Sequence, residues 1–372
     1  MLYLGIDQHS KQLTVCVREE AGRVIMRRQV STEPARVLAF FDEIQVASQD
    51  QAGFAVALEV CGFNDWLIVL LEKYECRHIV LIHPDKRSKR KTDRRDANAL
   101  GEVLWLNRER LAAGRKLQGL RQVVIPTAQD QQARELTALR QRVAQRRTRT
   151  INQVQNVLRR HNLMWDCPTK GFQTIKVSKW LRDMTEHLPP QMSRADWITL
   201  VHLLEQWRMC DNQLLDAEAE IRGMSADNAA VKLLRTVPGV SDYSGLALAC
   251  RIGSIERFPR PRSLANYFGL TPGCRNSGET TDRLGSITKD GSRIARFILG
   301  QLVLHVLKQD GQMRIWYAGI KKRRGSKIAR VAVMRRLTTI MWHMLKRQEA
   351  YVVGGPPRRL TAAEKSKAKT RS

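Results

Sequence analysis

The run Tyr3-Leu4-Gly5-Ile6-Asp7 has the composition of a buried β-strand, and it ends on a carboxylate. Phe54-Ala55-Val56-Ala57-Leu58-Glu59 repeats this arrangement further along the chain. Apolar strands separated by helical segments are typical of an α/β sheet. Acids at the C-terminal ends of such strands lie where open α/β sheets carry their chemistry. We therefore expect Asp7 and Glu59 to converge at one edge of one sheet.

The rest of the N-terminal part predicts a mixed α/β sheet. Three strands joined like antiparallel neighbours come first, and helices and strands then alternate. The expected strands are 3–7, 13–17, 24–26 and onward, 54–59 and 78–82, and the expected helices are 34–43, 64–74 and one that carries Asp93 and Asp96.

The run Lys91-Thr92-Asp93-Arg94-Arg95-Asp96-Ala97 places two carboxylates three residues apart in a basic segment. On a helix they share one face and repel each other, so a solvated helix gains nothing from them. A divalent cation reverses this, because hard cations bind clustered carboxylate oxygens. The alternative is a pair of acids favoured by the helix dipole. With Asp7 and Glu59 they make four carboxylates, which can hold two Mg²⁺ ions about 4 Å apart on a phosphodiester.

Composition points to a polyanionic partner. The 372 residues carry a net charge of +28, which favours nucleic acid first and a membrane surface second. No apolar run approaches membrane-spanning length, and the N-terminus lacks the pattern of a signal peptide. The seven cysteines are scattered without a CxxC, which is typical of reduced thiols in a cytoplasmic protein and argues against zinc.

The middle of the chain predicts long helices. Apolar residues between Leu136 and His161 follow a three-four spacing, which indicates a long amphipathic helix or a coiled coil. A second helical segment runs over about 196–222, and we expect the two to pair with each other or with a second protomer. Arginines decorate the first helix, as a solvated face or as phosphate contacts; they are Arg140, Arg142, Arg146, Arg147, Arg149, Arg159 and Arg160.

The C-terminal part predicts a mainly helical domain. Val237-Pro238-Gly239-Val240 resembles the turn of a helix-hairpin-helix, in which backbone amides hold a phosphate without reading sequence. The alternative is an ordinary turn between helices, and Ser241 stands where such motifs often have a second glycine. The expected domains are 1–125, 126–228 with coiled-coil character, 229–350, and a basic disordered tail at 351–372.

These motifs together resemble the DEDD transposases of bacterial insertion sequences, from Met1 to about residue 345. In the N-terminal part the resemblance rests on Gly5-Ile6-Asp7, Glu59 and the run 91–97. In the C-terminal part it rests on Val237-Pro238-Gly239-Val240, Phe268-Gly269-Leu270-Thr271-Pro272, Ser277-Gly278, Gly285, Thr288-Lys289, Gly291 and Arg296.

The resemblance implies a ribonuclease H-like (RuvC-like) catalytic domain followed by a transposase domain with a nucleophilic serine. Asp7, Glu59, Asp93 and Asp96 fall on the family's metal-binding acids, with Mg²⁺ as the cofactor, and Ser277 falls on its serine. The implied partners are donor and target DNA, a non-coding guide RNA called a bridge or seeker RNA, and further copies of the chain in a homodimer or homotetramer. The implied location is the bacterial cytoplasm, at the nucleoid, without a membrane partner.

Two rival hypotheses come from other functional classes. The first is a structure-selective, metal-dependent nuclease of the Holliday-junction-resolvase type, which uses water as the nucleophile and leaves Ser277 a structural role in a polar turn. The second is a non-catalytic nucleic-acid-binding protein. Clustered acids without a metal cost stability, which argues against the second.

Overall fold

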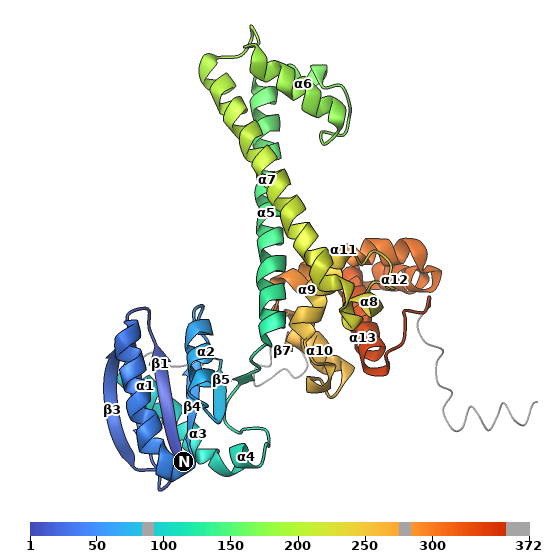
Figure 1. Cartoon of the computed structure of the whole chain (residues 1–372). Coiled ribbons are helices and arrows are strands. Elements are labelled where there is room, and N and C mark those ends of the chain that lie inside the picture. The colour runs from blue at the N-terminus through green and yellow to red at the C-terminus, as the bar shows by residue number, and fades with distance from the viewer. Residues whose placement is uncertain (84–92, 275–283, 355–372) are drawn as a thin grey trace, which may run out of the picture. The chain divides into compact units, whose positions relative to one another are not determined.

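The computed structural model describes residues 1–83, 93–274 and 284–354, without the side chains of 93–95, 274 and 284. The chain divides into two compact units, Met1–Ile125 and Pro126–Ser372 (Figure 1). The expected domain limits at 125, 228 and 350 stay predictions. Most of the expected tail, 355–372, lies outside the described residues.

The first unit is built on a mixed sheet, as the sequence predicts. Its order in the described part is β3-β2-β1-β4-β5-β6, with β1 parallel to β4, β4 parallel to β5, and the remaining neighbours antiparallel. The strands are β1 (Leu2–Gln8), β2 (Gln12–Arg18), β3 (Val24–Ser31), β4 (Phe54–Glu59), β5 (His78–Ile82) and β6 (Gln122–Val123).

The two faces of this sheet are covered by different helices. Leu4, Ile6 and Val56 belong to a core with α1 (Pro34–Ser48) and α2 (Asp65–Lys73). Tyr3, Ala55 and Ala57 point to the opposite face, because side chains alternate along a strand. There they pack against α3 (Asp93–Leu106) and α4 (Arg108–Ala112). Figure 1 shows α1 on one side of the strands and α3 on the other.

At Gly5, helix α3 contacts β1 backbone to backbone. A Cβ atom on Gly5 would lie 2.1 Å from the Ala97 carbonyl oxygen and 2.2 Å from the Gly101 nitrogen. Only a glycine at position 5 therefore allows this approach. Ala55 and Ala57 on the neighbouring strand β4 have small side chains, so they too let α3 lie close to the sheet. The position of α3 along β1 is fixed by this contact.

The second unit begins with a helical hairpin of α5 (Ala128–Arg160) and α7 (Arg194–Ala226), with α6 (Ile175–Glu186) near its tip (Figure 1). The two long helices expected from the sequence thus pair within one chain. The remaining helices form a separate core around Leu248, Leu299 and Leu337. They are α8 (Ala229–Leu234), α9 (Asp242–Ile252), α10 (Pro261–Tyr267), α11 (Arg293–Gln309), α12 (Gly311–Arg324) and α13 (Ser326–Arg347), accompanied by the strands β7 (Pro272–Cys274) and β8 (Leu284–Ile287) and by 3₁₀ turns at Gln49–Gln51, Leu163–Asp166 and Ile255–Arg257.

Replacing Gly5 by alanine should unfold or displace α3. The added methyl group meets backbone atoms, which cannot rotate away, so we expect a loss of at least about 3 kcal/mol in unfolding free energy. Gly62→Ala is the matched control, because a Cβ there meets no atom within 4 Å. Urea unfolding of the full chain measures both variants, and equal stabilities would show that α3 does not depend on Gly5.

Candidate active site

Asp7 and Glu59 lie side by side at one edge of the sheet. Ile6 pairs with Leu58 in the parallel ladder, so the two acids occupy the next positions on strands about 4.8 Å apart. Because side chains two residues apart on a strand share a face, Asp7 and Glu59 point to the same face as Gly5 and Ala57, which is the face covered by α3. The Asp7 carboxylate is 13% exposed and contacts the His9 ring, with Nε2 3.2 Å from Oδ2.

A buried polar pair ties the ends of these two strands together. Asn64 donates to the Gln8 side-chain oxygen (2.9 Å) and to the Glu59 carbonyl (3.1 Å). Gln8 in turn donates to the Phe63 carbonyl at 2.9 Å, and the Cys61 amide donates to Asn64. Because Gln8 and Asn64 are only 6% and 4% exposed, water competes little with these bonds. This network, which no sequence pattern predicted, fixes Glu59 relative to Asp7.

The first turns of α3 carry the second pair of expected acids. The helix begins at Asp93, whose side chain lies outside the described residues, and Asp96 is half-buried beside the buried Ala97. Arg18 of β2 donates to Asn98 (3.1 Å) and forms an ion pair with Glu102 (3.6 Å). These bonds set the rotation of α3 while the Gly5 contact sets its depth. The helix that carries Asp96 thus covers the sheet face toward which Asp7 and Glu59 point.

The donor chemistry of this edge suits a hard divalent cation, because all its expected ligands are carboxylates. Among the described side chains, no group of three or more His, Cys, Asp or Glu is close enough to hold a metal ion. Asp7, Glu59 and Asp96 are among those side chains and do not form such a group by themselves. Asp93 is not among them, so the complete set of four acids is not tested. What the structure brings together is the pair at the strand ends and the helix that carries the other two.

Ser277 lies in the chain between β7 and β8, in residues 275–283, outside the described part. The two strands around it form an antiparallel pair, in which Pro272 lies opposite Ile287. The Thr288 and Lys289 amides donate to the carbonyls of Thr271 and Gly269, at 3.0 and 3.1 Å. The base of the segment that carries Ser277 is therefore a closed hairpin.

Arg296 of α11 holds both ends of that hairpin. One terminal nitrogen of its guanidinium group, Nη1, donates to the carbonyls of Phe268 (3.1 Å), Asp290 (2.8 Å) and Gly291 (3.2 Å). Burial lowers the pKa of this guanidinium, and the nearby Asp290 partly offsets that effect.

Two glycines allow the backbones at this point to touch. Gly269 and Gly291 have φ of +67° and +77°, and a Cβ on either would lie 2.0 Å from a carbonyl oxygen. The spacing of these residues in the sequence gave no sign of this clamp.

The turn between α8 and α9 is built around Gly239, where φ is +85° and a Cβ would lie 2.5 Å from the His305 side chain. Ser241 caps α9 in a reciprocal box with Ser244. A phosphate expected at the α9 amides would compete with that capping bond. The helix cap therefore gives a structural reason for a serine at position 241.

Two stretches of the chain match models of transposase families. Residues 4–163 match the DEDD transposases of the IS110 type, and residues 231–318 match the transposase IS116/IS110/IS902 family. The transposase for insertion sequence element IS1111A of Coxiella burnetii is 27% identical over 359 residues, which cover 94% of this chain and 91% of that protein. A probable family 20 transposase of Pseudomonas aeruginosa is 24% identical over 360 residues, covering 94% of this chain and 98% of that protein.

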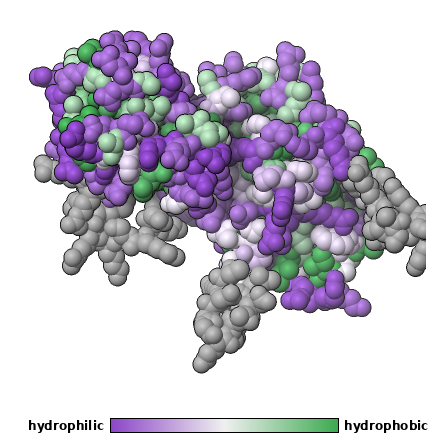
Figure 2. Space-filling model, turned by 90° about the horizontal axis from the view of Figure 1, so that it is seen from below, coloured by the Kyte–Doolittle hydropathy of each residue, from purple (hydrophilic) through white to green (hydrophobic). Residues whose placement is uncertain are grey.

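The chain belongs to the IS110 family of DEDD transposases. It is a transposase enzyme, and the substrate class of such enzymes is DNA. In the described part of the transposase, no helix is both long and apolar enough to span a bilayer. Figure 2 shows hydrophilic residues over most of the face that it presents.

The arginines expected to decorate α5 fall into two groups. Arg140, Arg147 and Arg160 form ion pairs with Glu218, Asp211 and Asp196 of α7, so they hold the hairpin together. For these three arginines the structure adds a role beside the two expected from the sequence, a solvated face or phosphate contacts. The remaining exposed members, which form no ion pair with a described carboxylate, are Arg142, Arg146, Arg149 and Arg159.

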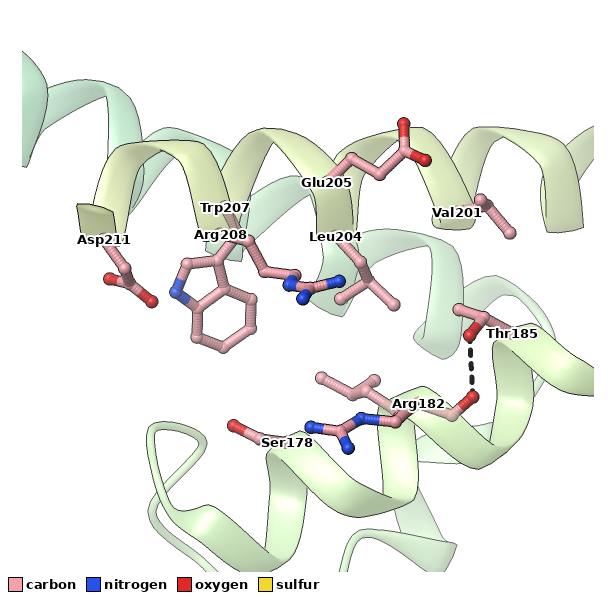
Figure 3. A pocket seen from close by; sticks show the side chains of 10 residues that line it. Ser178, Arg182, Thr185, Val201, Leu204, Glu205, Trp207, Arg208 and Asp211 are labelled. Carbon is pink, nitrogen blue, oxygen red and sulfur yellow. Dashed lines mark hydrogen bonds between the residues drawn. The ribbon is translucent and has the colours of Figure 1, made fainter. Parts of the chain in front are cut away.

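A cavity of about 330 Å³ lies between α6 and α7, far along the chain from the expected acids. Figure 3 shows that Arg182 and Arg208 point into it, beside the Trp207 ring. None of the residues predicted for catalysis lines this cavity. We therefore keep the sheet edge of the first unit and the β7–β8 hairpin of the second unit as two candidate regions, each taken by itself.

Arg296→Gln should loosen the hairpin that carries Ser277. A glutamine side chain is shorter than arginine and carries no charge, so it cannot donate to all three carbonyls. The Thr288 and Lys289 amides should therefore exchange hydrogen at least about tenfold faster. Strand exchange by the transposase should fall in parallel. Arg293→Gln is the matched control, because Arg293 is an exposed neighbour on α11 that makes none of these contacts. Unchanged exchange in Arg296→Gln would remove Arg296 from this positioning role.

Proposed function

We propose that this transposase cuts and rejoins DNA strands with a carboxylate metal site and a serine nucleophile. The site consists of Asp7, Glu59, Asp93 and Asp96, and the nucleophile is Ser277. The observation that carries the proposal is the arrangement at one sheet edge. Asp7, the last residue but one of β1, and Glu59, the last residue of β4, lie at the ends of adjacent parallel strands, and α3, which begins with Asp93, is packed backbone to backbone on β1.

The proposal includes a ribonuclease H-like fold for the first unit. Three antiparallel strands followed by two parallel ones, in the order β3-β2-β1-β4-β5, support this assignment. In this sheet the switch from antiparallel to parallel pairing falls at β1, and Asp7 is the last residue but one of that strand. The first acid thus lies where open sheets carry their chemistry.

Mg²⁺, in two ions, is the cofactor that the four carboxylates would hold, and it would supply charge neutralisation at the reacting phosphate. The residues of the chain do the positioning. The bonds from Asn64 keep the β4 end against β1, and the Gly5 contact fixes the depth of α3, the helix that carries Asp93 and Asp96. A rigid arrangement of this kind reduces the reorganisation that the reaction requires.

The serine step conserves the energy of the cut bond. Ser277 Oγ forms a bond to phosphorus, and the bond from phosphorus to the departing sugar oxygen breaks. The serine hydroxyl gives up its proton, and the departing oxygen takes one, so charge and atoms balance. A hydroxyl from another DNA end reverses the step and reseals the strand. Water as the nucleophile would discard this bond energy and would leave a nuclease.

The proposal also names the partners. Donor and target DNA are the substrates, a non-coding guide RNA pairs with them, and the transposase acts as a homodimer or homotetramer. The family resemblance supports the RNA and the assembly, and the net charge of +28 suits two polyanions. RNA sequencing after stringent purification from cells tests this part, because a defined co-purifying RNA is expected.

Removing one acid should stop cleavage without preventing DNA binding. Asp7→Asn, Glu59→Gln, Asp93→Asn and Asp96→Asn should each lower the rate by at least about a hundredfold, since each removes an anionic ligand. Asp50→Asn, at an exposed acid outside the sheet edge, is the control. The measurement compares strand cleavage with DNA affinity for each variant. Full activity in any two of the four would refute the four-carboxylate site.

Ser277 should become covalently attached to DNA. Labelled target DNA, guide RNA and Mg²⁺ are incubated with the transposase and resolved on a denaturing gel. A slow, protease-sensitive species should appear with the native chain and vanish in Ser277→Ala, which should keep its nucleic-acid binding. Cleavage with free ends and no adduct would favour the water-using nuclease. Normal recombination by Ser277→Ala would exclude the serine mechanism.

A further inference from the structure

Helices α12 and α13 form an uninterrupted basic hairpin. Residues 311–347 contain eleven Lys and Arg and no Asp or Glu. The two helices pack against each other and are joined by Gly325 alone. On α7, by contrast, basic residues are interspersed with acids. So long a stretch without a carboxylate is not the mixed charge pattern of an ordinary solvated surface.

The cations concentrate at the turn of this hairpin. Lys321, Lys322, Arg323 and Arg324 form the last turn of α12, Lys327 lies in the first turn of α13, and Arg330 follows one turn later. All six side chains are exposed. No described carboxylate forms an ion pair with any of them, whereas Arg140, Arg147 and Arg160 on α5 each have one.

The contacts that these six residues do make are to backbone. Arg323 donates to the Gly319 carbonyl at 3.3 Å, and Arg330 donates to the Gly300 carbonyl at 2.8 Å. A carbonyl orients a guanidinium but neutralises no charge. The positive charge of the hairpin turn is therefore left for a partner outside the described chain.

The helix dipole accounts for four of these six cations. Four cations at the C-terminal end of α12 are favoured there, because that end is negative. Lys327 is different, because it lies at the positive N-terminal end of α13, where a cation is disfavoured and an acid is preferred. The first turn of α13 has no acid, and Gly325 provides no side-chain cap. Folding alone thus selects against Lys327, which an external anion would account for.

We propose that the α12–α13 turn, residues 321–330, binds the phosphate backbone of duplex DNA. The proposal rests on DNA as the substrate of the transposase and not on its metal site or its serine. Gly325 has φ +81°, and a Cβ there meets no atom within 4 Å, so the turn is open to a bulky backbone. Contacts of this kind fix the position of the duplex without reading its sequence.

The first test measures how duplex binding depends on salt. Lys321, Lys322, Arg323 and Arg324 are all changed to glutamine, and fluorescence anisotropy follows a labelled duplex without Mg²⁺ between about 50 and 200 mM salt. The slope of log K against log salt should shrink by about 0.9 for each phosphate that is no longer neutralised, or about 2–4 in total. The matched control removes the same charge from α5, through glutamine at Arg142, Arg146, Arg149 and Arg159.

The control separates a specific surface from net charge. The slope should fall clearly further in the hairpin variant than in the α5 variant. An equal or smaller decrease overturns the proposal, because it would mean that net charge alone governs binding. Single-stranded RNA of the same sequence is the second probe. Weakened RNA binding with unchanged duplex binding would also overturn the assignment to DNA.

Lys327→Glu gives the second test, because it should change the stability of the fold and the affinity for duplex DNA in opposite directions. An acid at the start of α13 is favoured by the helix dipole, so the melting temperature should rise by about 1–3 °C. Duplex affinity should fall by about tenfold, since attraction to a phosphate is replaced by repulsion. A variant that is less stable and binds normally would show that Lys327 serves the fold, and the proposal would be wrong.

Discussion

The close approach of α3 to β1 is the contact on which the candidate site depends. Gly5 leaves no room for a side chain between the strand and the Ala97 carbonyl, so the helix rests on the backbone of the sheet. A backbone contact of this kind fixes the distance between the helix and the strand, and it leaves the helix almost no freedom to slide along the strand. The acid at the end of β1 and the acids at the start of α3 are consequently held by the same contact, and a change in one position moves the other.

Charge organises the second unit in two different ways. On the α5–α7 hairpin, arginines of one helix meet acids of the other, so the charges stabilise the pairing and largely cancel. At the turn between α12 and α13, residues 321–330, no described carboxylate pairs with a cation, and the Lys and Arg side chains are exposed. The same residue types therefore form intramolecular ion pairs in one place and a surface for a polyanion in another. Counting arginines cannot separate the two cases, because the acids that pair with them come from distant parts of the chain.

Much of the fold could be predicted from local patterns. The strands at 54–59 and 78–82 have the expected bounds, because apolar runs there stop at polar residues, and the periodicity from Leu136 onward found the long helix α5. Helix α6 was missed, and so were the Gln8–Asn64 network and the Arg296 clamp, because these depend on contacts between residues far apart in sequence. For the site, Asp7 and Glu59 converge as predicted from strand ends, whereas the side chain of Asp93 and all of Ser277 lie outside the described residues.

Localised cleavage by bound iron is the most direct test of the central claim, which is that one sheet edge and α3 together hold metal. Fe²⁺ takes the place of Mg²⁺ at carboxylate ligands, and with ascorbate and peroxide it cuts the polypeptide beside the site it occupies. Mass spectrometry then maps the cuts. The account predicts cuts next to Asp7, next to Glu59 and at the start of α3, all suppressed by excess Mg²⁺. Cuts confined to other parts of the chain, or cuts that Mg²⁺ does not suppress, would contradict it.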